Sequence, residues 1–139
     1  MAAQTYNLSF SGYWLDRNKE SIDSSSGVYC VYACTSNPNK TVSIRKLIYI
    51  GEASNVRERL REHEKYADWK SHLKPGETLC FSFAAVEVYS RERCEAAMIN
   101  KHKPPENIEY KNTFPFDKTT MILSGRTALL HTNFTVERS

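Results

Sequence analysis

The fold is decided by the stretch Gly27-Val28-Tyr29-Cys30-Val31-Tyr32-Ala33-Cys34, followed after a short gap by VSIRKLIYIG at 42–51. Both runs are rich in β-branched and aromatic residues, a composition typical of buried strands. The intervening segment TSNPNK, at 35–40, contains the Asn and Pro residues that turns favour. The two runs therefore predict a β-hairpin with a long loop.

Beyond this hairpin, the spacing of apolar residues predicts further elements in an alternating order. Ser54 and Ser90 are the expected N-caps of two helices, and Pro104-Pro105 prevents the second of these from continuing. The expected elements are helices over 54–65, 66–73 and 91–102 and a strand over 78–89.

The two ends of the chain carry weaker patterns. Residues 6–14 predict an irregular or edge strand, and the polar segment 16–26 reads as a loop. Near the C-terminus, 119–123 and 127–134 flank Ser124-Gly125 and predict a hairpin. The order of elements indicates one α+β domain over residues 1–139, with a small, mainly antiparallel sheet flanked by helices and an extra C-terminal hairpin.

Composition excludes several classes of protein. With 139 residues, 40% hydrophobic and 25% charged, the chain matches a globular domain and not a disordered or fibrous one. Its longest apolar run has seven residues, whereas a membrane helix needs about 20. The first residues, MAAQTYNLSF, lack the pattern of a signal peptide, so we expect an intracellular, cytoplasmic protein with no membrane partner. The net charge of +3 permits a polyanionic partner without requiring one.

The cysteines do not have the spacing of a metal site. None forms a C-x-x-C motif, so no structural zinc site is expected. We expect buried, reduced thiols that pack as small apolar groups. The four residues are Cys30, Cys34, Cys80 and Cys94.

Three segments carry the functional interpretation. The first is GVY at 27–29, and the second is YIG at 49–51 with Arg57 eight residues after Tyr49. The third contains Glu95 and, twelve residues later, Asn107. In their order and on their expected elements, these residues resemble the GIY-YIG nuclease family over about residues 27–107.

The resemblance implies a fold and an activity. Members of the family have a small antiparallel sheet flanked by helices, and they cut phosphodiester bonds in DNA with one divalent metal ion. For this chain it implies an endonuclease that uses Mg²⁺ or Mn²⁺, of restriction, phage or mobile-element type. RNA as the substrate stays open.

The resemblance also implies roles for five residues. Tyr29 would accept a proton from the attacking water, and Tyr49 would orient the water or the phosphate. Arg57 would contact phosphate oxygens with its planar guanidinium. Glu95 would be the one carboxylate that binds the metal ion, and Asn107 would fix the following loop or hydrogen-bond within the site. A phenol near a metal ion or an arginine has a lowered pKa, which suits a proton acceptor.

Four more residues are candidates for binding nucleic acid. Their structural alternatives stay open, because His63 lies on the apolar stripe of Val56 and Leu60, and arginines on a helix often form a solvated basic face. The candidates are Arg45, Lys46, Arg61 and His63.

The chain also departs from the family pattern. Glu52 follows the YIG motif where a lysine is common, and the two tyrosines are twenty residues apart, about twice the usual interval. The additional length falls in 35–46, which contains Lys40 and either reaches DNA or is a solvated insertion.

These departures keep a second function open. The chain could be a catalytically weak domain that binds nucleic acid or protein and retains the nuclease fold. For an active enzyme, one metal site cuts one strand, so a double-strand break requires either a homodimer or sequential nicking.

Overall fold

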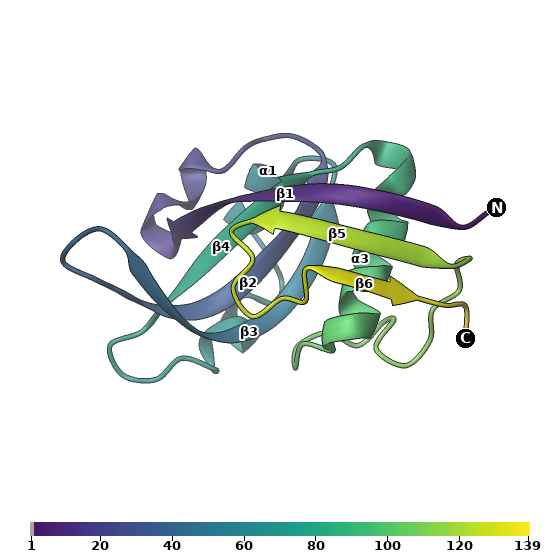
Figure 1. The fold of residues 1–139 in the computed structure, drawn as a ribbon. Helices are drawn as coiled ribbons and strands as arrows, with labels where there is room; N and C mark the ends of the chain where they lie inside the picture. Colours follow the sequence, from purple (N-terminus) through teal and green to yellow (C-terminus); the bar gives the residue numbers. More distant parts are fainter. Residues whose placement is uncertain (1) are drawn as a thin grey trace.

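A six-stranded sheet, with strand order β3-β2-β4-β1-β5-β6, forms the frame of the computed structural model, which describes residues 2–139 (Figure 1). Mostly antiparallel pairing and a few helices confirm the predicted α+β class. The elements are β1 (Gln4–Leu15), the 3₁₀ helix η1 (Asp16–Ser21), β2 (Gly27–Ser36), β3 (Val42–Ala53), α1 (Val56–Arg61), α2 (Tyr66–Lys70), β4 (Thr78–Ala85), α3 (Val88–His102), β5 (Thr119–Gly125) and β6 (Asn133–Val136).

The predicted hairpin is present and lies at one side of the sheet. Strand β2 pairs with β3 on one side and with β4 on the other, both antiparallel. Eight consecutive residues of β2, Gly27 to Cys34, are buried, because helices cover both faces of the sheet here. This double coverage explains why the sequence of β2 is continuously apolar.

Of the two alternatives predicted for the N-terminal strand, the edge position is wrong, whereas the irregularity is present as a register shift between Gly12 and Trp14. β1 lies inside the sheet, antiparallel to β4 and parallel to β5. Its outer face is open to solvent along much of its length, so polar residues alternate with the buried Leu8 and Phe10. This polar alternation reflects one solvated face, and it does not indicate a missing neighbour. The C-terminal hairpin of β5 and β6 is present and extends the same sheet, but Ser124 and Gly125 belong to β5 and not to the turn, and the second strand begins at Asn133 and not at 127.

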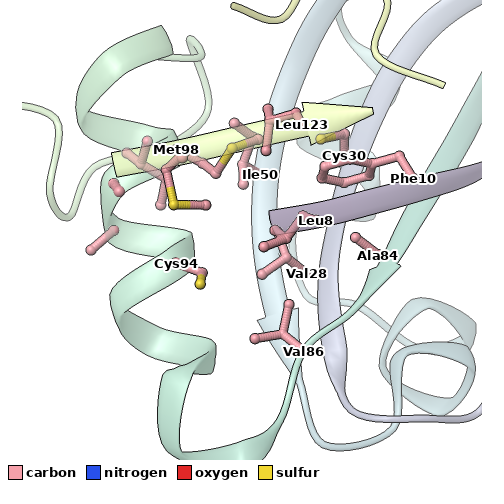
Figure 2. Packing of buried hydrophobic residues seen from close by; sticks show 14 of the residues in the cluster. Leu8, Phe10, Val28, Cys30, Ile50, Ala84, Val86, Cys94, Met98 and Leu123 are labelled. Atoms are coloured by element: carbon pink, nitrogen blue, oxygen red, sulfur yellow. The ribbon is translucent and has the colours of Figure 1, made fainter. Parts of the chain in front are cut away.

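The main core lies between α3 and the sheet (Figure 2). Cys94 and Met98 of α3 face Val28, Ile50 and Leu123 of three strands. All four cysteines are buried free thiols, as expected. A second cluster on the opposite face packs the fully buried Trp69 of α2 with Ile22, just after η1, and with residues of α1, β2, β3 and β4.

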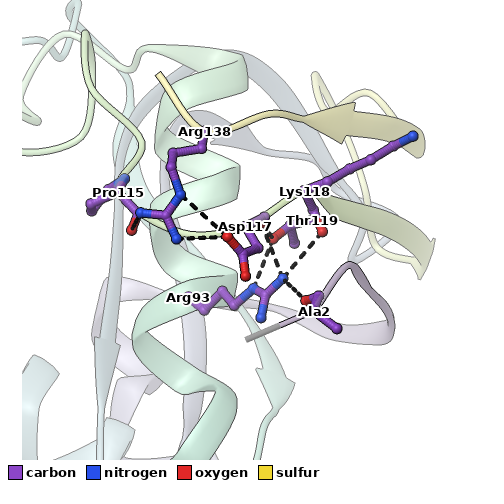
Figure 3. Close-up of polar contacts among 7 residues, drawn as sticks. All are labelled: Ala2, Arg93, Pro115, Asp117, Lys118, Thr119 and Arg138. Carbon is purple, nitrogen blue, oxygen red and sulfur yellow. Dashed lines mark hydrogen bonds and ion pairs between the residues drawn. The ribbon is translucent and has the colours of Figure 1, made fainter.

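A buried arginine ties the N-terminal segment to α3 and β5 (Figure 3). The Arg93 guanidinium donates to Thr119 Oγ1 at 2.8 Å and to the backbone oxygens of Ala2, Asp117 and Lys118 at 3.1 Å each. Arg138 donates to Asp117 Oδ1 beside it. These bonds satisfy the charge at the place where three chain segments meet.

Two helix starts differ from the predictions. Asn55, and not Ser54, caps α1 by accepting a hydrogen bond from Glu58 N at 3.1 Å. α3 begins at Val88 without a side-chain cap, and β4 ends at Ala85. The strand was predicted to continue to residue 89 because Val88 and Tyr89 are residue types that strands favour. Both side chains are exposed and belong to α3. No helix within residues 2–139 has the length and apolar character to cross a bilayer.

Candidate active site

The two motif tyrosines lie on adjacent strands. Tyr29 of β2 is opposite Gly51 of β3, and a Cβ atom at position 51 would lie 2.3 Å from the Tyr29 hydroxyl. The missing side chain of Gly51 therefore makes room for Tyr29, which is 1% exposed. Close approach of a phenol from the same protein accounts for this glycine without any appeal to bound DNA.

A β-bulge at the second motif redirects Tyr49. Consecutive residues Val31 and Tyr32 of β2 pair with Tyr49 and Leu47, which leaves Ile48 as the extra residue of β3. Ile48 and Tyr49 then both contact the cluster around Trp69, where the Tyr49 and Trp69 ring centroids are 5.3 Å apart. Bulges commonly re-aim a side chain in this way.

His63 holds the hydroxyl of Tyr29. Its Nε2 lies 3.0 Å from Tyr29 Oη, and its Nδ1 accepts a hydrogen bond from Lys65 N at 3.1 Å. Because Nδ1 accepts, the proton of the neutral ring is on Nε2, which donates to the phenol oxygen. Burial, together with the charge of Arg59, lowers the pKa of His63 to about 4, so the ring is neutral at pH 7.

Both tyrosines are protonated in the chain by itself. Burial raises the pKa of Tyr29 well above its usual value, and burial together with Glu95 raises the pKa of Tyr49 to about 12. For the protein without a bound metal ion, the prediction of a lowered phenol pKa is wrong. Desolvation raises the pKa of both tyrosines by more than the charge of Arg59 lowers it.

The cation that faces the tyrosines is Arg59. Its charge acts on the pKa values of Tyr29, Tyr49 and His63, and Glu64 holds its guanidinium through two bonds of 2.8 and 2.7 Å. Arg57 points elsewhere, since its Nε donates to Ile22 O at 2.6 Å. Positions 57 and 59 differ by about 200° around a helix, which separates the two side chains.

Glu95 and Tyr49 line one hollow of about 210 Å³ at the outer side of β3. Lys65 enters the same hollow from the segment between α1 and α2, and Glu109 enters from the loop after α3. The segment between α1 and α2 packs on one face of the sheet and α3 packs on the other, and both contribute side chains to this hollow. Two of the three motif segments, the YIG segment and the segment that contains Glu95 and Asn107, meet here.

The electrostatics of this hollow fit a cation. Burial and then the negative charges of Glu52, Glu109 and Glu92 raise the pKa of Glu95 to about 8. A bound divalent ion would relieve this repulsion and favour the carboxylate form. Among the described residues no three His, Cys, Asp or Glu side chains are grouped as metal ligands. Mg²⁺ accepts one protein carboxylate when water and substrate phosphate complete its coordination, so Glu95 fits that role.

Glu52, the departure from the family pattern, is paired. Arg91 Nε donates to Glu52 Oε1, while Arg91 NH1 donates to Ser26 Oγ at 2.9 Å. The extra carboxylate is therefore ion-paired with an arginine of α3. Its negative charge still raises the pKa of Glu95 by more than the charge of Arg91 lowers it.

Asn107 anchors the loop after α3. It is buried, its Oδ1 accepts from Ile50 N, and its Nδ2 donates to Ile50 O, both at 2.9 Å. These bonds imitate the pairing of a neighbouring strand at the edge of β3. Of the two alternatives predicted from the sequence, the structure supports fixing the loop.

Three of the predicted nucleic-acid contacts are engaged within the protein. Arg45 binds Glu77 and His72 O, Lys46 lies 2.9 Å from His72 Nδ1, and Arg61 binds Glu20. Only His63, among the four candidates, joins the tyrosines.

Sequence reasoning missed Arg59 and Lys65. Arg59 lies in α1, but His63 follows the end of this helix, so helical spacing does not relate the two residues and gave no signal for Arg59. Lys65 comes after the end of α1, so helical spacing could not have placed it.

Comparison with known proteins gives one match. The family model of the GIY-YIG catalytic domain matches residues 28–112. No curated protein and no solved structure matches the chain.

Proposed function

Because the chain belongs to the GIY-YIG family, whose members are endonucleases, we propose that it is an active, metal-dependent enzyme that hydrolyses phosphodiester bonds in DNA. The observation that carries the proposal is the shared hollow of Tyr49 and Glu95, next to the pair of Tyr29 and His63. Side chains from β2, β3 and α3 and from the segment after α1 converge there, although they are far apart in sequence.

Each residue has a role that follows from its position. Glu95 would hold Mg²⁺ or Mn²⁺, and the bound ion would neutralise phosphate charge and lower the pKa of water and of nearby phenols. Tyr49 is half-buried and lines the hollow, so its hydroxyl meets the attacking water or the phosphate. Tyr29 lies behind it, and His63 Nε2 donates to the Tyr29 oxygen in a way that would stabilise a phenolate.

Two cations complete the site. Arg59 stabilises negative charge on the phosphate as the reaction proceeds, and its pairing with Glu64 fixes the orientation of the guanidinium. Lys65 lies in the hollow on the side opposite α3 and offers a contact for a phosphate oxygen. Asn107 is a positioning residue, because its polar atoms bond to Ile50.

Plasmid cleavage tests the proposal. We expect supercoiled DNA to be cut in Mg²⁺ but not in EDTA. Glu95→Gln should abolish cutting because it removes the carboxylate while keeping the size of the side chain. The matched control is Glu137→Gln, which removes the same charge from an exposed position near the C-terminus and should cut like the wild type.

Two results would contradict the proposal. Full activity of Glu95→Gln would reject the single-carboxylate site. DNA binding without any cleavage by the wild type would favour the alternative of a binding domain that retains the fold. The same assay addresses assembly, since nicked circles that accumulate before linear DNA indicate a monomer, whereas direct linear product indicates a homodimer.

A further inference from the structure

A groove lies at the end of the sheet where β1 finishes and the β2–β3 loop begins. Two adjoining hollows, of about 210 and 460 Å³, share Tyr13, Lys40, Thr41 and Val42 in their linings. The smaller one continues to Arg126 after β5, and the larger one continues to Arg17 of η1.

The groove is basic. Arg17, Lys40 and Arg126 line it, and no Asp or Glu side chain does. None of these three cations is ion-paired within the described part of the chain. This differs from Arg45, Arg59 and Arg61, each of which binds a carboxylate. Arg126 Nε donates to Gly12 O at 3.3 Å, which leaves its charge uncompensated. Three cations with no carboxylate partner among the described residues therefore surround one depression and form a positive potential that a polyanion would satisfy.

Hydrogen bonds fix the segments that carry the cations. In the β2–β3 loop, Asn37 N donates to Thr41 O at 2.8 Å and Lys40 N donates to Asn37 O at 3.1 Å. On the other side, Ala128 N donates to the Tyr13 hydroxyl at 3.0 Å and Arg126 N to Phe10 O at 2.9 Å. Preorganised cations lose less conformational entropy on binding than mobile ones.

The groove is also within reach of DNA held at the active site. Six residues of β3 lie between Val42, in the groove lining, and Tyr49, in the catalytic hollow, but two β-bulges shorten this stretch, because it pairs with only the five steps from Val31 to Ser36 of β2. At about 3.3 Å per residue this is a span of about 17 Å. That length corresponds to about five base pairs of duplex DNA, with phosphates about 3.4 Å apart along each strand.

We propose that this groove binds the phosphodiester backbone of duplex DNA about five base pairs from the scissile phosphate, through Arg17, Lys40 and Arg126. Tyr13 and Trp14 form the apolar part of its wall. This inference rests on the proposed function for the position of the cut, but the binding itself does not depend on catalysis. It gives the long β2–β3 loop a function in holding the substrate.

The first test measures DNA binding in EDTA, so that cleavage does not interfere. The variant Arg17→Ala/Lys40→Ala/Arg126→Ala should bind a 30-base-pair duplex at least about tenfold more weakly than the wild type at 0.1 M salt. The slope of log Kd against log[salt] should decrease by about 2 to 3, since each lost phosphate contact removes about 0.9 from this slope. The control Lys74→Ala/Lys101→Ala/Lys118→Ala removes the same charge from exposed positions outside the groove and should retain the wild-type slope.

The second test locates the contact. A photoreactive group on Lys40→Cys should crosslink to duplex DNA about five base pairs from the cut, whereas the same group on Lys101→Cys should not. The four native cysteines are buried, which limits labelling to the new thiol.

The outcomes separate this inference from the proposed function. The groove assignment is wrong if the groove variant, like the lysine control, keeps the wild-type slope of log Kd against log[salt]. It is also wrong if Lys40→Cys gives no crosslink, even where plasmid cleavage is normal. If cleavage fails but the groove variant alone loses affinity, the groove stands as a DNA-binding site and the nuclease proposal fails.

Discussion

Arg59 and Arg57 differ in what their side chains contact, although both belong to the same short helix. The charge of Arg59 reaches both tyrosines, whereas Arg57 bonds to the backbone of Ile22. We expect Arg59→Ala to lower the cleavage rate by about 10²- to 10³-fold, the usual cost of removing one preorganised donor at a developing charge. Arg57→Ala serves as the matched control and should keep the rate within about tenfold of the wild type. Single-turnover cleavage of plasmid measures both.

A reversed order of effects would restore Arg57 as the phosphate contact. Arg59→Lys adds a second criterion, because a point charge does not replace a planar fork. Equal rates for Arg59→Lys and the wild type would show that only net charge matters at this position.

The site residues that could be predicted from the sequence are those that the spacing of the family motifs defines. Tyr29, Tyr49 and Glu95 could be named because their order and spacing resemble a known family, and the structure brings Tyr49 and Glu95 to one hollow. The choice between two arginines depended on where α1 begins and how it turns, and the predicted cap was one residue early. The burial that raises the phenol pKa values comes from α2 and Trp69, which no motif contains.

The contact between β2 and β3 at Gly51 constrains both strands. We expect Gly51→Ala to destabilise the protein by about 1–3 kcal/mol, because the added methyl group would overlap the Tyr29 ring and hydroxyl within a fixed register. The displaced phenol should also lose its bond to His63, so cleavage should decrease with it. Urea unfolding and plasmid cutting report the two effects.

Ser54→Ala is the control for Gly51→Ala, since it adds no volume at an exposed position just after the end of β3. Wild-type stability in Gly51→Ala would mean that Tyr29 can move aside at no cost, contrary to the tight packing described here.

At the element scale, the long apolar runs were the most predictable features. β2 is buried on both faces and therefore has an unmistakable composition, whereas β1 has one solvated face and reads as an edge. The parallel pairing of β1 with β5 joins residues more than a hundred positions apart, and no local pattern encodes such a partner. The bulge at Ile48 likewise arises from the register between strands and not from the composition of β3.

Stability of the whole molecule should depend on pH through buried histidine. The folded chain keeps His63 neutral down to a pKa of about 4, whereas the unfolded chain protonates it near 6.5. Stability from this residue is therefore complete above about pH 6.5 and is lost as the pH falls toward 4. His102 is also buried with a lowered pKa and acts in the same direction.

We expect the free energy of unfolding to decrease by about 2 kcal/mol from His63 alone between pH 7 and pH 5. In His63→Gln this contribution should vanish, leaving the decrease from His102 and an opposite contribution from Glu95, whose pKa is raised to about 8 and which therefore adds stability as the pH falls from 7 to 5. Urea titrations at the two pH values measure the difference, and equal slopes in the two proteins would show that His63 is protonated in the folded state. Glu64 and Glu77, with pKa values of about 2, lose their contributions only at lower pH.

The parallel pairing of β1 with β5 also has a consequence for biosynthesis. β1 leaves the ribosome before its neighbours β4 and β5, which lie at Thr78–Ala85 and Thr119–Gly125. Arg93 similarly bonds to Ala2 and to residues 117–119, so its hydrogen bonds are complete only when both of these segments are present. The nascent chain can form the β2–β3 hairpin early, but the interior strand must wait with its apolar face uncovered. The hollow of Tyr49 and Glu95 is thus encoded between β1 and β5, while the sheet that supports it closes only after β5 has been translated.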